Sequence, residues 1–346
     1  MLRAAQDVAA KQAAMRLYNG DASTLHGIFA VNKPPGISCA GLLDYFKRNI
    51  TKGSSSMSFS EHFDRERALR ARSDIINKKA RRRFVPSNIR VGHGGTLDVE
   101  AAGVLVFGIN HGCKQLSEYL VGGKSYLATG LLGVATESYD AEGSVSYLAD
   151  TAIAGARIQE AIPQFIGDIM QRPPIYSAIK LDGKRLYEYA RGGENIPAEV
   201  LPRKVTVSDV KLLYYENQDT GERIGRRVML PADHAHYYAT GKYEWHHQLA
   251  DRPVVGQPLL PFANQPTAPK FQLLINSGGG VYVRSLIHDL GQAVGSAATM
   301  VSLVRTSQGP LRLDRDTINP EDLVYLDRVK EAIHHADTII QGRSIN

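Results

Sequence analysis

The chain contains 346 residues, of which 43% are hydrophobic and 22% are charged. These proportions are ordinary for a soluble globular protein and exclude collagen-like and intrinsically disordered classes. The length exceeds that of most single domains, although one large α/β catalytic unit with insertions also fits it. Two cysteines are too few for a disulfide framework, so we expect an intracellular, reducing compartment. No apolar run approaches the roughly 20 residues needed to cross a bilayer, and no membrane contact is expected.

The positive charge is concentrated in one segment. Between Lys47 and Arg90 there are thirteen Lys and Arg against four acids, a net charge of +9, whereas the whole chain carries only +6. One interpretation is a solvated, disordered patch. The other is a phosphate-binding surface, centred on Arg81, Arg82 and Arg83, that positions RNA without reading its sequence.

The N-terminal part begins with an alanine-rich stretch. Its Asp7 favours a plain helix over a mitochondrial transit peptide. Residues 27–38 then predict a short apolar strand, stopped by Pro34, Pro35 and Gly36 because proline cannot extend a ladder. Ser38 is expected to cap a helix that runs to about Lys47.

Turn and strand signals are densest between residues 90 and 143, which we interpret as the catalytic core. VGHGGTLD is followed by the apolar run AAGVLVFGI and by the strand-like KSYLATGLLG. Between the last two, a short helix is predicted, with Leu116, Tyr119 and Leu120 on one face. The preceding residues, about 49–88, have little apolar periodicity and look like an insertion, partly helical and partly mobile.

The C-terminal half alternates extended segments with helices. Residues 171–193 predict a Pro-Pro arm that leads into a short helix, and the strand-like RKVTVSDVKLL follows. A polar excursion covers about 216–268. FQLLINSGGGVYVRSLIHDLG then predicts a strand, a glycine turn and a helix whose apolar face is formed by Val283, Leu286, Ile287 and Leu290.

Several motifs could carry chemistry, and each has a structural alternative. The Gly92–Asp98 loop can present His93 and Asp98 to a ligand, or it can be a helix entry capped by Thr96 or Asp98, with His93 a hydrogen-bonded structural histidine. The helix after the glycine triplet could hold a phosphate beside Arg284, or Arg284 could be a solvated helix charge. Tyr126, in a strand-like run, is by default a core aromatic.

Two other candidate sites are weaker. GKS at residues 123–125 lacks the earlier glycine of a phosphate-binding P-loop, because Glu118 stands at that position. His234, His236, His246 and His247 lie in the polar excursion without cysteines or an HExxH motif, so a solvated loop is favoured over a metal site.

The ordered set NKPPGIS, GHGGTLD, AAGVLVFGI, KSYLATGLLG, RPPIYSAIKLDGKRLYEYAR, RKVTV and GGGVYVRSLIHDLG resembles the TruB family of tRNA pseudouridine-55 synthases, especially its fungal members. The resemblance covers about residues 27–310, apart from the insertions at about 49–88 and 216–268. It implies an α/β (α+β) pseudouridine synthase core, with a mixed, largely antiparallel sheet flanked by helices. Residues 1–26 and 311–346 are expected to be extensions, the latter too short for the PUA domain of bacterial members.

The resemblance also implies roles for single residues. Asp98 matches the catalytic aspartate, and Val99 follows it where the family often has proline. Substrate-binding roles are implied for His93, which helps to displace the base, Tyr126, which packs against it, Arg284, which pairs with the aspartate, and Tyr282. The arm matches the segment that embraces the T-loop of tRNA, with Lys180, Lys184 and Arg185 as RNA contacts.

The implied reaction converts uridine 55 to pseudouridine and requires neither a metal nor an organic cofactor. We expect a stand-alone monomer without an obligatory protein partner, acting on tRNA in the nucleus, mitochondrion or cytoplasm, with mRNA as a further candidate substrate. Two alternatives remain open at this point. One is a guide-dependent, dyskerin-like synthase, and the other is an RNA-binding or RNA-folding protein that uses the same core.

Overall fold

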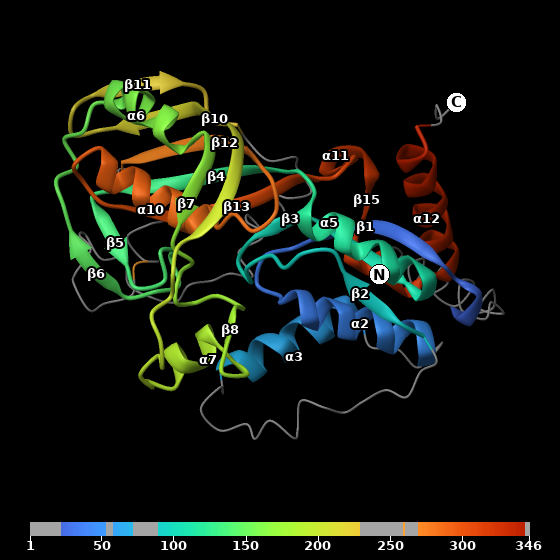
Figure 1. The fold of residues 1–346 in the computed structure, drawn as a ribbon. Helices are drawn as coiled ribbons and strands as arrows, with labels where there is room; N and C mark the ends of the chain where they lie inside the picture. The colour runs from blue at the N-terminus through green and yellow to red at the C-terminus, as the bar shows by residue number, and fades with distance from the viewer. Residues whose placement is uncertain (1–21, 53–57, 72–88, 229–258, 260–268, 343–346) are drawn as a thin grey trace, which may run out of the picture. The chain divides into compact units, whose positions relative to one another are not determined.

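The computed structural model describes residues 22–52, 58–71, 89–228, 259 and 269–342. The chain divides into two compact units, of which the first comprises residues 1–122 and 305–346 and the second residues 123–304 (Figure 1). The expected N-terminal helix, the basic residues Arg81, Arg82 and Arg83, and the four histidines between residues 234 and 247 lie outside the described residues. The predicted domain boundaries stay a prediction.

The sheet of the first unit is formed around the predicted apolar runs. Strand β1 (Gly27–Lys33) pairs antiparallel with β3 (Ala102–Ile109), and every residue of β3 is buried. Strand β2 (Val91–His93) joins β3, the short β15 (Thr317–Ile318) joins β1 in parallel, and β14 (Leu311–Arg312) pairs with the end of β13 (Ala298–Gln308). A continuous apolar run without alternation is the pattern expected of a strand covered on both faces.

Helices cover this sheet. Helix α2 (Cys39–Lys52) begins where predicted, because the Ser38 hydroxyl accepts a hydrogen bond of 3.0 Å from the Gly41 amide, but it ends five residues later than expected. Helix α3 (Phe59–Ala71) gives the basic insertion a helical part and is joined to α2 by a 2.9 Å hydrogen bond between His62 Nε2 and the Gly41 carbonyl. Helix α12 (Leu326–Ile340) lies along β1 (Figure 1).

One short helix of the first unit differs from its predicted packing. Helix α5 (Leu116–Val121) buries Leu116 and Tyr119 as predicted, but Leu120 is 50% exposed, because a helix of less than two turns presents only a narrow face to its neighbours. The remaining elements are η1 (Ala22–Thr24), η3 (Asn110–Gln115), α11 (Leu313–Asp316) and η5 (Pro320–Val324). No helix among the described residues is long and apolar enough to cross a membrane.

The sheet of the second unit is antiparallel and has the order β11-β10-β12-β4. Its strands are β4 (Lys124–Leu132), β10 (Arg203–Asn217), β11 (Glu222–Gly225) and β12 (Lys270–Ser277), and β7 (Gly167–Gln171) also pairs with β10. Two small hairpins, β5 (Val134–Thr136) with β6 (Val145–Leu148) and β8 (Lys180–Leu181) with β9 (Lys184–Arg185), accompany it. The helical elements are α6 (Gly155–Ala161), η4 (Ile162–Phe165), α7 (Leu186–Arg191) and α10 (Val283–Ala293). The α+β class with a mixed, largely antiparallel sheet is therefore confirmed.

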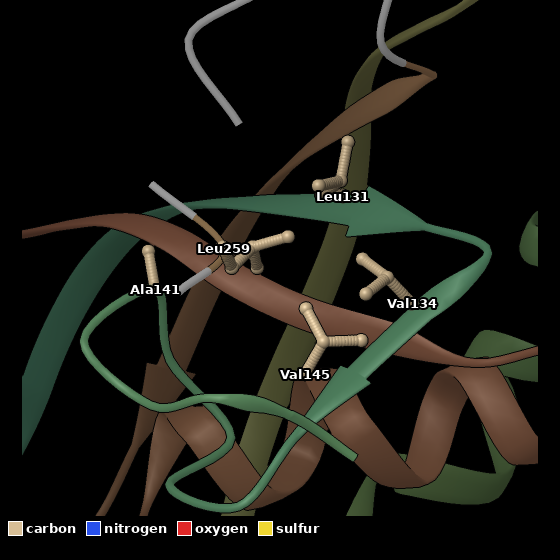
Figure 2. Close-up of a cluster of buried hydrophobic side chains, with 5 residues drawn as sticks. All are labelled: Leu131, Val134, Ala141, Val145 and Leu259. Atoms are coloured by element: carbon tan, nitrogen blue, oxygen red, sulfur yellow. The ribbon is translucent and has the colours of Figure 1, made fainter. Parts of the chain in front are cut away.

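A hydrophobic cluster supports the loop between β5 and β6. It contains Leu131, Val134, Ala141, Val145 and Leu259, all buried (Figure 2). Burying apolar area of this kind stabilises a fold by about 25 cal/mol per Å². Because Ala141 lies within the loop itself, the cluster fixes the loop against the end of β4, and this loop carries part of the candidate site.

Candidate active site

The glycine-rich loop is not a helix entry. His93 is the last residue of β2, residues 94–101 have no helical structure, and β3 begins at Ala102. The interpretation of Thr96 or Asp98 as a helix cap is therefore wrong, because the chain turns directly from one antiparallel strand into the next. Asp98 closes part of this turn, since its carbonyl accepts a hydrogen bond of 3.2 Å from the Ala101 amide.

A buried lysine, missed as a site residue in the sequence, holds the segment after Asp98. Lys33 Nζ donates hydrogen bonds to the carbonyls of Pro34 (3.0 Å), Val99 (2.9 Å) and Ala101 (2.6 Å). Burial lowers the pKa of Lys33 to about 8, and the carboxylates of Glu100 and Asp98 are among the charges that oppose this fall. The only sequence signal was a charge at the end of an apolar strand.

The other side of the loop is held by residues of α2 and β13. Leu97 donates from its amide to Cys39 Sγ (3.2 Å), and the Cys39 thiol donates to the Leu97 carbonyl (3.4 Å). The buried Arg305 donates from Nε to the Val104 carbonyl (2.7 Å) and from a terminal nitrogen to the Gly95 carbonyl (3.2 Å). Lys33 thus binds the backbone after Asp98, and Arg305 binds the backbone before it. The loop is therefore fixed before any ligand arrives.

His93 is held as a neutral imidazole. Burial lowers its pKa, and the nearby Arg305 guanidinium lowers it further. The Gly95 amide donates to Nδ1 at 3.4 Å, which assigns the imidazole proton to Nε2. A neutral Nε2–H can donate a hydrogen bond to a base without adding charge to the loop.

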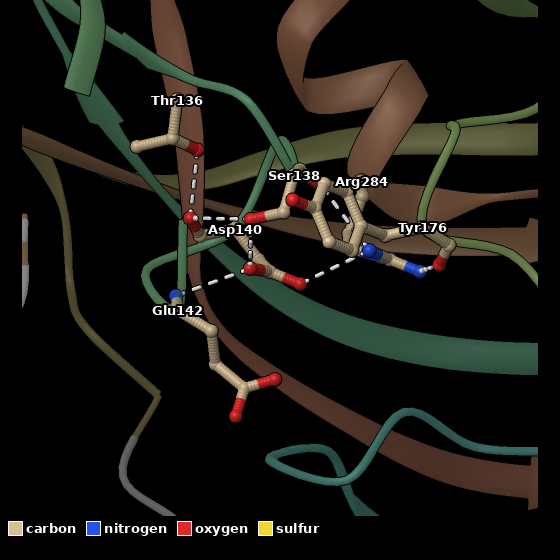
Figure 3. Close-up of polar contacts among 6 residues, drawn as sticks. All are labelled: Thr136, Ser138, Asp140, Glu142, Tyr176 and Arg284. Atoms are coloured by element: carbon tan, nitrogen blue, oxygen red, sulfur yellow. Dashed lines mark hydrogen bonds and ion pairs between the residues drawn. The ribbon is translucent and has the colours of Figure 1, made fainter. Parts of the chain in front are cut away.

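In the second unit, Arg284 is a buried cation and not the solvated helix charge that one interpretation allowed. It is 4% exposed. One terminal nitrogen donates to Asp140 Oδ2 and to the Ser138 carbonyl, both at 3.1 Å, and the other donates to the Tyr176 carbonyl at 3.0 Å (Figure 3). Arg284 therefore joins the start of α10 to two loops. Its expected pairing with Asp98, a residue of the other unit, stays a prediction.

Asp140 was not found by sequence reasoning, although it lies in a turn rich in small polar residues. Its Oδ1 accepts hydrogen bonds from the Ser138 hydroxyl (2.5 Å) and the Glu142 amide (3.1 Å), and its carbonyl accepts one from the Thr136 hydroxyl (2.7 Å) (Figure 3). Oδ2 is thereby left to face Arg284. A paired and hydrogen-bonded carboxylate of this kind is the usual partner of a buried guanidinium.

The two expected tyrosines occupy different kinds of position. Tyr126 lies on β4 opposite Ile275 of β12 and is buried. Tyr282 directly precedes α10, and its backbone is fixed by Gln171, whose side-chain amide accepts from the Tyr282 N–H (2.8 Å) and donates to its carbonyl (3.0 Å). The end of β7 therefore fixes the segment that carries Tyr282 and Arg284.

The arm after β7 presents the three expected basic residues on its small hairpin. Lys180 and Arg185 are exposed, and Arg185 also donates to the Tyr187 hydroxyl at 3.1 Å. Lys184 forms an ion pair with Glu194 and lies 4.5 Å above the centre of the Tyr189 ring. Ser285 of α10 anchors the start of the arm by donating to the Arg172 carbonyl at 3.1 Å.

The described residues contain no group of three or more His, Cys, Asp or Glu that could hold a metal ion. The first unit places a carboxylate on a rigid loop, with buried cations that bind the backbone on both sides of it and a neutral histidine beside it, and such a fixed carboxylate suits acid–base or nucleophilic chemistry. The second unit contributes the buried Tyr126 and an exposed basic hairpin, which are the kinds of group that receive a base and a phosphate backbone.

Residues 81–228 match the family model described as "TruB family pseudouridylate synthase (N terminal domain)", and the chain belongs to this family of RNA pseudouridine synthases. It is 33% identical over 329 residues to tRNA pseudouridine synthase 4 of Saccharomyces cerevisiae, covering 85% of this chain and 79% of the relative. It is also 31% identical over 317 residues to the human pseudouridylate synthase TRUB1, covering 91% and 70%. Among solved structures, that of a Cbf5-Nop10-Gar1 complex matches with a TM-score of 0.48 and 19% identity over 90% of this chain and 59% of the other.

Proposed function

We propose that this enzyme converts uridine 55 in the T-loop of tRNA to pseudouridine, without a guide RNA, and that Asp98 is its catalytic carboxylate. The observation that carries the proposal is the immobilised GHGGTLD loop, in which Lys33 and Arg305 bind the backbone on both sides of Asp98. The name of the yeast relative supports a tRNA-directed pseudouridine synthase, and that of the human relative supports a pseudouridylate synthase.

The reaction breaks the bond between N1 of uracil and C1′ of ribose, rotates the base and joins C5 to C1′. The proton on C5 is lost and N1 gains one, so no redox change or net hydrolysis occurs. Asp98 can act by attack on the ribose, by attack on the base or by removing a sugar proton. The three routes share the requirement for an ionised carboxylate in a fixed position.

Access to a stacked uridine requires base flipping, which costs on the order of a few kcal/mol. In the proposal His93 helps to displace the base, since its neutral Nε2–H can donate to RNA, and Tyr126 offers an aromatic face to the flipped uracil. Arg284 pairs with Asp98 during the reaction, and Tyr282 supports the same pocket. The Arg284–Asp140 ion pair orients the guanidinium.

RNA is held by phosphate contacts along the arm, through Lys180, Lys184 and Arg185, and by Arg81, Arg82 and Arg83 of the basic insertion. These contacts contribute affinity and register. The exposed hairpin that carries the first three residues supports this assignment. We further propose that the enzyme is a monomer without an obligatory protein partner. It acts on tRNA in the nucleus, mitochondrion or cytoplasm, and mRNA is a further candidate substrate.

The decisive experiment incubates the purified protein alone with unmodified tRNA and maps pseudouridine at single-nucleotide resolution. We expect one modified site, position 55, and no modification by Asp98→Asn, whereas a matched control at the exposed Asp314, Asp314→Asn, keeps the wild-type rate. Modification only after a guide RNA is added would favour the dyskerin-like alternative. RNA binding without any modification would favour an RNA-folding protein.

A further inference from the structure

Tyr139 occupies an unusual backbone position between two residues that bind Arg284. Its φ angle is 63°, in the left-handed region that bulky side chains rarely adopt. The residue before it supplies the carbonyl, and the residue after it the carboxylate, that accept hydrogen bonds from the same Arg284 nitrogen. The backbone conformation of Tyr139 therefore determines whether the Ser138 carbonyl and the Asp140 carboxylate can both face the guanidinium of Arg284.

The Tyr139 side chain is stacked on a histidine of the helix that carries Arg284. The ring centres of Tyr139 and His288 are 3.9 Å apart, and the ring planes are inclined by 14°. His288 lies four residues after Arg284, one turn further along α10, so both side chains lie on the same side of the helix. The loop thus contacts α10 at two successive turns, once through the ion pair and once through the stacked rings.

Backbone contacts complete the support of this turn. The Tyr139 amide donates to the Thr136 carbonyl at 3.3 Å, and the Tyr139 carbonyl accepts from the Met300 amide of β13 at 3.0 Å. These bonds hold the main chain of residue 139, whereas the ring is the part that reaches α10. Burial lowers the pKa of His288, so at neutral pH the stack joins two uncharged rings.

From this geometry we propose that Tyr139 and His288 are positioning residues for pseudouridine formation, whose stacked rings hold Ser138 and Asp140 in register with Arg284. This inference rests on the proposed function, because Arg284 matters to the rate only if the second unit serves the uridine reaction. A purely structural role for the stack would instead lower stability and leave the rate of the folded enzyme unchanged.

The test uses the full-length enzyme, four single variants at these two residues, the double variant of Tyr139→Asn with His288→Ala, and one control variant. Tyr139→Asn removes the ring but keeps a residue that tolerates the left-handed conformation, and His288→Ala removes the other ring. Tyr139→Phe and His288→Phe preserve stacking. The exposed Tyr147 of β6 supplies the matched control, Tyr147→Asn. For each protein one measures the single-turnover rate at saturating tRNA, the Kd for tRNA and the Tm.

We expect Tyr139→Asn and His288→Ala to lower the saturating rate by roughly ten- to a hundredfold, because small displacements of a reacting group are costly, with Kd within about threefold of wild type. The double variant should be no slower than the slower single variant, since both changes remove one contact. The two Phe variants should retain at least half of the wild-type rate, and Tyr147→Asn all of it.

Three results would overturn the inference: a wild-type rate for Tyr139→Asn, multiplying losses in the double variant, or a loss seen only in Kd or Tm. The wild-type enzyme is measured first, so failure of the proposed function and failure of the positioning role give different results. Absence of pseudouridine with wild-type protein contradicts the proposed function, whereas a wild-type rate shared by all variants contradicts only the positioning role.

Discussion

Lys33 donates a hydrogen bond of 2.6 Å from Nζ to the carbonyl of Ala101, three residues beyond Asp98. A second bond of 2.9 Å reaches Val99, the residue next to the carboxylate. The lysine thus acts on the backbone of the candidate catalytic loop and not on its side chains. Its charge is buried to hold a turn in place, which makes it a sensitive point for mutation.

Lys33→Met should reduce activity more than stability. The substitution keeps most of the apolar side-chain volume but leaves the Pro34 and Ala101 carbonyls without their buried donor, at a cost of about 1–3 kcal/mol each, part of which is offset by no longer burying a charge. We expect a folded protein whose single-turnover rate on tRNA falls at least tenfold. The exposed Lys114 provides the control, Lys114→Met, which should match wild type in rate and in urea denaturation. Equal rates for both variants would contradict the role of Lys33.

The pKa of Lys33 also predicts a pH dependence of stability. Folding lowers this pKa from 10.5 to about 8, so between these values the unfolded chain binds a proton that the folded chain has released. The contribution of Lys33 to the free energy of unfolding is therefore fully present above about pH 10.5 and is lost as the pH falls through about 8. As the pH rises through this window, the free energy of unfolding of wild type should increase relative to that of Lys33→Met by about 1.4 kcal/mol per pH unit. A difference that stays constant from pH 8 to 10 would refute this.

His93 should remain neutral at a pH where an ordinary histidine is charged. Burial and Arg305 lower its pKa below 6.5, so its contribution to stability is present above pH 6.5 and is lost as the pH falls through the lower folded-state value. An NMR titration should show the His93 ring protons changing at lower pH in the folded protein than in the urea-unfolded chain. Coincident midpoints would argue against the assigned Nε2–H donor.

Asp140→Ala should damage both fold and catalysis. It removes the Asp140 carboxylate from the guanidinium of Arg284, which is 4% exposed, and breaking a buried pair costs about 3–5 kcal/mol. We expect a lower denaturation midpoint and a reduced rate at saturating tRNA. Asp140→Asn, which retains an oxygen acceptor, should be the milder variant in the denaturation measurement. If Asp140→Ala has the stability and rate of wild type, the ion pair has no part in the site.

Neutralising the arm should weaken RNA binding in a salt-dependent manner. Replacing Lys180, Lys184 and Arg185 by Gln should lower the slope of log Kd against log salt by about 0.7–0.9 for each phosphate contact that is lost. The same measurement on Arg81, Arg82 and Arg83 separates the contribution of the basic insertion. Lys330→Gln, which changes a lysine 3.7 Å from Asp327 on α12, serves as the control and should leave the slope unchanged. An unaltered slope in the arm variant would mean that these three side chains are solvated and contact no phosphate.

Local features of this fold could be predicted from the sequence. Ser38 caps α2 by accepting a hydrogen bond from the amide of Gly41, three residues further along. The apolar spacing from Val283 to Leu290 defines one face of α10. Both signals lie within a few residues of the structure they specify. The candidate residue Asp98 was reached through the resemblance of GHGGTLD to a known family, since its spacing from His93 alone allowed a helix cap.

Contacts between distant parts of the chain could not be predicted in this way. Asp140 and Arg284 are separated by 144 residues and Lys33 and Ala101 by 68, and no periodic pattern encodes such pairs. A charge inside an apolar run, as at Lys33 and Arg305, is the one hint that the sequence offered, because an ionised group is buried only where partners receive it. The stacking of Tyr139 on His288 had no sequence signal at all.

The position after the candidate catalytic residue is held through its main chain. The carbonyl of Val99 is bound by Lys33 and by the Gly36 amide, and a carbonyl is present whichever amino acid stands there. A proline, which is frequent there in the family, would keep this carbonyl but would fix φ and remove the amide donor. Any residue at position 99 therefore offers Lys33 the same acceptor, so the lysine holds the main chain of the loop independently of the side chain beside the carboxylate.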